Sequence, residues 1–197
     1  ALSADYSWSF TTATSPPPEG ILINEVDADT PGKDTAEFIE LTDGGRGGVD
    51  LTGLVVVLWN GRDDRAYRAF DLAGYRTSGT GHFVLGNTAL ETVDLPFAAA
   101  TLQNGPDAVS LHAGRAADFP PGAPLTTTGL VDALVYGAGD PPDAELLALL
   151  IPGEAPADEA GRGATERDSS QRCPDGAGGP RRTAAYRASA PTPGATN

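Results

Sequence analysis

Residues 21–41 read ILINEVDADTPGKDTAEFIEL, and this stretch decides the fold. Ile21–Val26 and Glu37–Leu41 alternate apolar and acidic side chains with the two-residue period of a β-strand. A tight acidic connection joins them, with Asp27, Asp29, Pro31, Gly32 and Asp34. Because successive side chains of a strand point to opposite faces, the carboxylates form one row and the apolar residues face a core. The pattern favours an antiparallel sheet with one face toward water.

Further strand patterns follow along the chain. Leu54–Asn60 (LVVVLWN) is a continuous apolar run, and Asn60–Gly61 is a strong hairpin signal before a partner strand at Tyr67–Leu72. More strands are expected at His82–Gly86, Asp107–His112, Leu130–Tyr136 and Ser169–Cys173. The one helical pattern, Asp143–Leu150, predicts a helix of roughly two turns. We therefore predict an all-β fold, an immunoglobulin-like β-sandwich with one short helix.

The two ends of the chain have the composition of linkers. Residues 1–20 form a Pro- and Thr-rich extended leader, in which Ala1–Phe10 is a candidate edge strand. The sandwich is expected over residues 21–188, and residues 189–197 resemble a C-terminal exit linker. The sequence contains no methionine. We therefore expect Ala1 either to follow a removed signal peptide or to begin a piece of a longer protein.

Charge and composition restrict the classes of function. The chain has 197 residues and a formal net charge of −14. Residues 161–187 hold six arginines and three acidic residues, a local charge of +3, which leaves −17 for the remainder. A field of that sign repels phosphate backbones and disfavours direct nucleic-acid binding by this chain alone. No apolar stretch approaches the roughly 18 residues of a transmembrane segment, and Cys173, the only cysteine, cannot form an internal disulfide.

Seven motifs occur in one order across about 177 residues: ILINEVDADTPGKDTAEFIEL, VDLTGLVVVLWNG, GHFVLGN, LQNGPDAVSLH, LVDALVYG, SSQRCPDG and PTPGATN. This order resembles the bacterial lamin-tail domain family, in the form found in secreted multidomain nucleases and phosphoesterases and in surface proteins. The resemblance implies an immunoglobulin-like sandwich, export from a bacterium, and an extracellular or cell-surface location.

The same resemblance implies an accessory module whose partner is an adjacent catalytic or surface domain of a longer chain. A protein or a cell-surface polymer is the ligand class that it leaves open. The metal-nuclease motifs of such proteins belong to the neighbouring domain, and no stretch of this chain matches them. The nuclear-envelope role of the animal relatives does not carry over, because the long heptad rod of a filament protein is missing here.

One group of acidic residues is a candidate metal site. Calcium prefers several hard oxygen ligands from one flexible loop, and closely spaced carboxylates are offered by Asp27, Asp29, Asp34 and Glu37. The spacing is not that of an EF-hand, and a solvated turn with an Asp-rich cap explains the same residues without an ion. Asp63 and Asp64, after the Asn60–Gly61 turn, are a weaker candidate for a calcium site. The sequence indicates no required cofactor, and calcium is the one candidate ion.

Catalytic arrangements are weakly indicated. His82 and His112 are the only histidines, which excludes a three-histidine zinc centre. Ser110 and His112 share one face of a strand near Asp107, but two such neighbours seldom reach the geometry of nucleophile and base, and no G-x-S-x-G turn is present. Cys173, beside Arg172, has no committed base. We therefore expect that the chain is not an enzyme.

The arginines near the C-terminus have two interpretations. Arg172, Arg181 and Arg182 are candidates for contact with a nucleic acid. Alternatively, the arginines neutralise the acidic face of the sandwich, and Arg172 locks the tail by pairing with a strand carboxylate such as Glu25 or Glu40.

The sequence is therefore consistent with three functions. The preferred one is a non-catalytic accessory module that places or anchors an attached nuclease or phosphoesterase, or mediates surface contacts. The alternatives are a calcium-stabilised structural spacer and a nucleic-acid-guiding domain of a linked extracellular nuclease.

Overall fold

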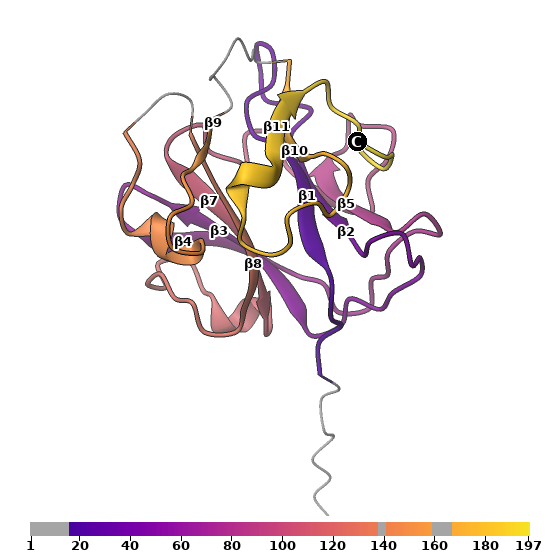
Figure 1. Ribbon diagram of the computed structural model, residues 1–197, viewed down its shortest axis with the longest axis horizontal. Helices are drawn as coiled ribbons and strands as arrows, with labels where there is room; N and C mark the ends of the chain where they lie inside the picture. The colour runs from indigo at the N-terminus through magenta and orange to yellow at the C-terminus, as the bar shows by residue number, and fades with distance from the viewer. Residues whose placement is uncertain (1–15, 138–140, 159–166) are drawn as a thin grey trace, which may run out of the picture.

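The computed structural model describes residues 16–137, 141–158 and 167–197 and contains two β-sheets packed on each other (Figure 1). The prediction of an all-β sandwich with very little helix is confirmed. None of the helices within the described ranges has the length and apolar character of a membrane span.

The first sheet has six strands in the order β11-β10-β1-β2-β5-β6. Their bounds are β1 Leu22–Asp27, β2 Phe38–Thr42, β5 His82–Asn87, β6 Leu95–Phe97, β10 Ser169–Arg172 and β11 Tyr186–Ser189. The two predicted opening strands pair antiparallel, with Glu25 directly opposite Glu40. In Figure 1 the late strands β10 and β11 lie beside the indigo β1, so the tail of the chain completes the sheet that its start begins.

The second sheet has five strands in the order β4-β3-β7-β8-β9. Their bounds are β3 Leu54–Asn60, β4 Arg65–Asp71, β7 Asp107–Ala113, β8 Leu130–Gly137 and β9 Ala157–Asp158. The hairpin predicted at Asn60–Gly61 is confirmed, and β3 pairs antiparallel with both β4 and β7. The central position of β3 explains its uninterrupted apolar sequence, since both of its faces are covered.

The main core lies between the two sheets. Alternate residues of each strand point inward, so the apolar row predicted for the opening strands meets the apolar row of the second sheet. Fully buried members include Ile23, Ile39, Leu41, Val56, Leu58, Leu111 and Leu134. Burial of one such side chain contributes roughly 1.5–3 kcal/mol, which makes this layer the main source of stability.

A second apolar layer covers the outer face of the five-stranded sheet. Val55, Val57 and Trp59 lie there beneath two 3₁₀ turns, η1 (Ala116–Asp118) and η2 (Leu146–Leu149). The helix predicted at Asp143–Leu150 is therefore a shorter 3₁₀ turn. Asp143, the first residue of the predicted helix, stabilises the start of this turn, because its Oδ1 accepts hydrogen bonds from the amides of Glu145 and Leu146.

The outer face of the six-stranded sheet differs from the prediction. The acidic row was expected to face water, but Glu25 and Glu40 are fully buried. The predicted exit linker covers them: residues 190–197, here named the C-terminal strap, lie across β1 and β2. A short 3₁₀ turn, η4 (Thr183–Ala185), leads into β11 before the strap begins.

Two strands of the first sheet escaped the sequence prediction. β6 has three residues and β11 is polar and largely exposed, so neither has the alternation that marks a half-buried strand. The edge strand predicted at Ala1–Phe10 lies outside the described residues.

Candidate functional site

The four predicted calcium ligands do not converge on a common point. Glu37 accepts hydrogen bonds from the amides of Thr101 and Leu102, at 3.0 Å each. Asp34 accepts from the amide of Thr30, and Asp29 from the side chain of Asn104. No three of the four bring ligand atoms within 4.8 Å of one another. The structure therefore does not bring these four residues together, and Glu37, Asp34 and Asp29 bond to neighbouring loops.

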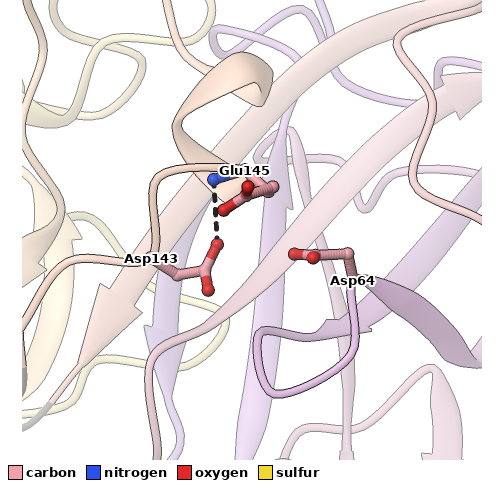
Figure 2. Close-up of side chains that lie close together, drawn as sticks. All are labelled: Asp64, Asp143 and Glu145. Carbon is pink, nitrogen blue, oxygen red and sulfur yellow. Dashed lines mark hydrogen bonds between the residues drawn. The ribbon is translucent and has the colours of Figure 1, made fainter.

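A different acidic group forms near the hairpin turn. One carboxylate oxygen from each of Asp64, Asp143 and Glu145 lies within 4.8 Å of the others, and within the described ranges no other His, Cys, Asp or Glu set of three or more does so. Figure 2 shows the three side chains pointing toward one another from the β3–β4 turn and the start of η2. Asp64 belonged to the weaker calcium candidate of the sequence analysis. Asp143 lies 79 positions further along the chain and is brought beside it by the fold.

The environment of Asp64 is unfavourable for its charge. Partial burial, and then the negative charges of Asp143 and Glu145, raise the pKa of Asp64. Its Oδ1 atom is buried and accepts no hydrogen bond from the described residues. Asp64 also has a positive φ of 56°, a region in which Asn, Asp and Gly are the common residues. The three carboxylates therefore repel one another at the surface of the sandwich.

Ser110 and His112 form a hydrogen-bonded pair, contrary to the expectation that strand neighbours seldom do so. His112 Nε2 lies 2.9 Å from Ser110 Oγ, and His112 Nδ1 lies 3.0 Å from the carbonyl oxygen of Thr128. Trp59 Nε1 donates to Ser110 Oγ at 2.6 Å. Both Ser110 and His112 have zero exposure, and burial lowers the pKa of His112. The bond from Trp59 therefore ties β3 to β7, and both members of the pair lie inside the protein.

Arg172 is buried at the junction of the two sheets. Its Nη2 atom lies 3.1 Å from Asp132 Oδ2 on β8, and both side chains have zero exposure. The other guanidinium donors bond to the carbonyl oxygens of Ile23, Ala177 and Gly179. The guanidinium also stacks on the ring of Tyr186, 4.6 Å from its centroid.

This environment corrects two predictions for Arg172. It locks the tail as proposed, but its partner is Asp132, because Gln171 is the residue that faces Glu25 across the register. Arg172 consequently points to the opposite, inner face of β10. A fully buried guanidinium also has no surface for a phosphate, so Arg172 is not a nucleic-acid contact in this fold.

The other two candidate arginines are also engaged. Arg181 donates from its guanidinium to the carbonyl oxygens of Ala148, Leu149 and Leu150, at the end of η2. Arg182 lies 3.6 Å from Glu154 in an ion pair, and about half of its side chain (53%) is exposed. Of the three, Arg182 offers the most surface for a ligand.

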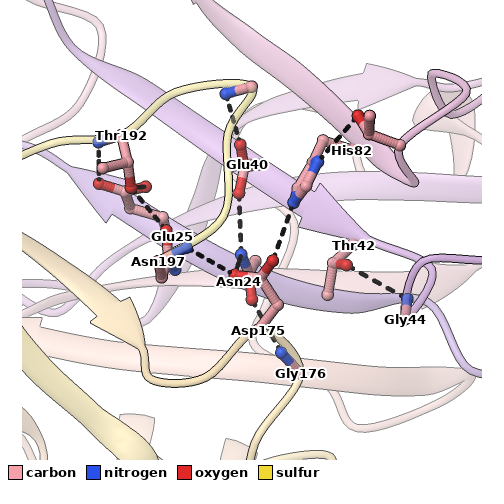
Figure 3. Close-up of polar contacts among 12 residues, drawn as sticks. Asn24, Glu25, Glu40, Thr42, Gly44, His82, Asp175, Gly176, Thr192 and Asn197 are labelled. Atoms are coloured by element: carbon pink, nitrogen blue, oxygen red, sulfur yellow. Dashed lines mark hydrogen bonds and ion pairs between the residues drawn. The ribbon is translucent and has the colours of Figure 1, made fainter.

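The most extensive polar arrangement lies under the C-terminal strap (Figure 3). Glu25 accepts hydrogen bonds from Ser169 Oγ and Gln171 Nε2 and from both the amide and the hydroxyl of Thr192. Glu40 accepts from Asn24 Nδ2 at 2.8 Å and from the amide of Gly194 at 2.6 Å. The sequence marked Glu25 and Glu40 as strand acids but carried no signal that residues 190–197 would cover them.

Asp175 and His82 extend the same network. His82 Nε2 lies 3.1 Å from Asp175 Oδ2, and Asp175 Oδ1 accepts from Asn24 Nδ2 and from the amide of Asn197. Burial raises the pKa of Glu25 and raises that of Glu40 to about 7, although the hydrogen bonds to each carboxylate oppose this shift. Two carboxyl groups on neighbouring strands are therefore held where their charged forms are costly.

Comparison with known proteins yields no relative: no protein-family model, curated protein or solved structure matches the chain. The lamin-tail resemblance therefore stays a prediction from the motifs. The fold is an all-β sandwich, and its immunoglobulin-like form stays part of the same prediction.

Proposed function

We propose that this chain is a non-catalytic interaction module of an exported bacterial protein. It would place or anchor an attached nuclease or phosphoesterase domain, or make contacts at the cell surface. The order of the seven motifs and the two-sheet architecture support this role.

The observation that carries the proposal is the state of the two histidines of the chain. Hydrolysis near neutral pH usually needs a general base or nucleophile within reach of the substrate, and histidine is the commonest choice. His112 has zero exposure and His82 has 4%, and both rings bond to groups of the fold. Ser110, which bonds to His112, is equally buried, and the exposed hydroxyl of Thr80, 3.3 Å from Nδ1 of His82, bonds to a ring that is itself 4% exposed. These groups act in folding, which favours a binding role over a catalytic one.

The two alternative functions have less support. A calcium-stabilised spacer would use Asp64, Asp143 and Glu145 in place of the predicted residues, and an acidic group alone does not identify an ion. A nucleic-acid-guiding role would need exposed arginines, but Arg172 is buried and the guanidinium of Arg181 bonds to backbone carbonyl oxygens. The net charge of −14 further opposes it.

The experiment that tests the proposal uses the exported gene product that contains this chain, with and without residues 21–197. Retention at the cell surface and turnover of a small soluble phosphodiester are measured on the same preparations. We expect the deletion to reduce retention and to leave turnover unchanged. Loss of turnover with unchanged retention, in a preparation whose remaining domains are folded, would contradict the proposal.

A further inference from the structure

The C-terminal strap and the face beneath it differ sharply in burial. Every residue of the strap is exposed or half-buried, and its sequence, APTPGATN, has no large apolar side chain. The groups that it covers, by contrast, are almost completely buried: Asn24, Glu25, Glu40, Gln171 and His82 are at most 4% exposed. The strap therefore shields a polar face without an apolar anchor of its own.

Hydrogen bonds to this face hold the strap. Its Thr192 and Gly194 bond to the carboxylates of Glu25 and Glu40, and Asn197 bonds to Asp175 Oδ1 and to the carbonyl oxygen of Arg172. Ala190 accepts from Gln171 Nε2. Most of these contacts involve an ionisable group, so the free energy of docking depends on the protonation of the face.

Glycine at position 194 is required by the docked geometry. Its φ is 81°, and a Cβ atom there would lie 2.6 Å from Thr92 Cγ2. Only glycine adopts this conformation at little cost and lets the backbone approach so closely. The amide of Gly194 can thereby reach Glu40.

The charges around the two carboxylates are unbalanced. Four ionisable groups of the described chain face the strap: Glu25 from β1, Glu40 from β2, His82 from β5 and Asp175 from the loop after β10. At the margin, Asp94 is bonded to the amide of Val84, and Arg187 is exposed on β11. Three acids thus share one imidazole, which is positive only when protonated. Closure of the strap removes water from Glu25 and Glu40, which favours their neutral forms.

We propose that residues 190–197 are a pH-dependent strap, which docks on Glu25 and Glu40 when these carboxyl groups are protonated and detaches locally as they ionise. In the open state the two carboxylates are hydrated again, which stabilises their charged forms. The bonds that hold the strap go to polar groups of the outer face, so we expect the core between the sheets to stay closed when the strap opens. The direction follows from the burial of both carboxyl groups and from the excess of acids over the one imidazole, and the raised pKa values of Glu25 and Glu40 agree with it, although the hydrogen bonds that the strap donates act the other way.

The test is residue-resolved hydrogen exchange on the intact chain at pH 5.0 and pH 7.5, with rates divided by the intrinsic rate at each pH. The amides of Thr192, Gly194 and Asn197 report the strap, and those of Val56 and Leu111 report the core. Because a full pKa unit is a tenfold change in an equilibrium constant, we expect strap protection to fall more than roughly tenfold between these pH values. Core protection should exceed strap protection at both.

Three variants make the result specific. Glu40→Gln should reduce the pH dependence of the strap amides, most of all that of Gly194, whose amide bonds to Glu40. The matched control is Glu37→Gln, since Glu37 is also a buried glutamate with a raised pKa but bonds to Thr101 and Leu102; its strap should respond to pH as in the unmodified chain. Gly194→Ala should lower strap protection at both pH values, and it keeps the test decisive if Glu40→Gln fails to fold.

Three outcomes would overturn the proposal. Strap protection equal to core protection at both pH values would mean that the strap opens only when the whole protein unfolds. Protection that rises with pH would reverse the predicted sign. Unchanged strap protection in Gly194→Ala would show that the bonds to Glu40 do not hold the strap.

Discussion

Arg172 and Asp132 form a fully buried ion pair that joins the two sheets of the sandwich, with Nη2 3.1 Å from Oδ2. Asp132 also accepts hydrogen bonds from the amides of Ile23, Arg181 and Ala133. Burial raises the pKa of Asp132, while the charge of Arg172 opposes that shift. Through this pair and its hydrogen bonds, the tail of the chain is fixed to β8 of the second sheet.

Removal of one partner should be costly. Arg172→Ala leaves a buried carboxylate without its counter-charge, and we expect a loss of about 3–5 kcal/mol in the free energy of unfolding. Urea denaturation measures this loss, with Arg187→Ala on the exposed side of β11 as the control, expected within about 0.5 kcal/mol of the unmodified chain. The double change Arg172→Met with Asp132→Leu should recover part of the loss. A cost below about 1 kcal/mol for Arg172→Ala would refute the structural role.

Ser110→Ala tests the interpretation of the Ser110–His112 pair. The change leaves Trp59 Nε1–H and His112 Nε2 without their shared partner in a buried site. We expect destabilisation of about 1–3 kcal/mol, the usual cost of an unsatisfied buried polar group. Ser189→Ala, at an exposed position of β11, is the control. Equal stability of the two variants would show that the hydroxyl of Ser110 contributes nothing to the fold.

Asp64→Asn should stabilise the protein in the absence of added divalent cations. Asparagine tolerates the positive φ of 56° at this position, and the change removes repulsion from Asp143 and Glu145. We expect a gain of roughly 0.5 kcal/mol, the scale of exposed charge pairs. Thermal unfolding in chelator measures it, and the exposed neighbour change Asp63→Asn should have a smaller effect. A lower melting temperature for Asp64→Asn would contradict the repulsion.

Much of the fold was predictable because most strands are locally encoded. β3, β5, β7 and β8 have continuous or alternating apolar residues, and their burial follows from those patterns. The hairpin that begins at Asn60–Gly61 is likewise local, with a four-residue turn, 61–64, between the paired residues Asn60 and Arg65. By contrast, β6 and β11 have no such alternation, and they form because a neighbouring strand offers an edge.

The candidate site was less predictable because its contacts connect distant segments. Glu25 and Glu40 have the spacing of water-facing strand residues, but β10 and the strap, through Thr192 and Gly194, cover them. The partner of Arg172 depended on whether position 172 faces inward or outward, and a shift of one residue reverses that direction. Long-range register of this kind leaves no trace in a single sequence.

Glu40 should make the stability of the protein depend on pH. Its pKa is raised from 4.5 to about 7 in the folded state, so the folded protein binds a proton more tightly than the unfolded chain. Its contribution to stability is then fully present below about pH 4.5 and is lost as the pH rises through about 7. His112, whose pKa is lowered, acts in the opposite direction, with stability lost as the pH falls below 6.5.

The comparison of the unmodified chain with Glu40→Gln isolates this contribution, because His112 is common to both. Urea denaturation from pH 4.5 to pH 7.5 should show a difference in stability between the two proteins that shifts toward the variant as the pH rises. A difference that is constant across this range would contradict the burial of a titrating Glu40 carboxyl group.

The central claim, that the polar groups of this sandwich serve folding and binding and not catalysis, is tested most directly by hydrolysis assays on the purified chain. DNA, RNA and a small phosphodiester are offered with magnesium, manganese or calcium, beside the folded variant His112→Asn. We predict rates equal to buffer for both proteins with every substrate and ion. Saturable turnover by the unmodified chain that is abolished in His112→Asn would contradict the account.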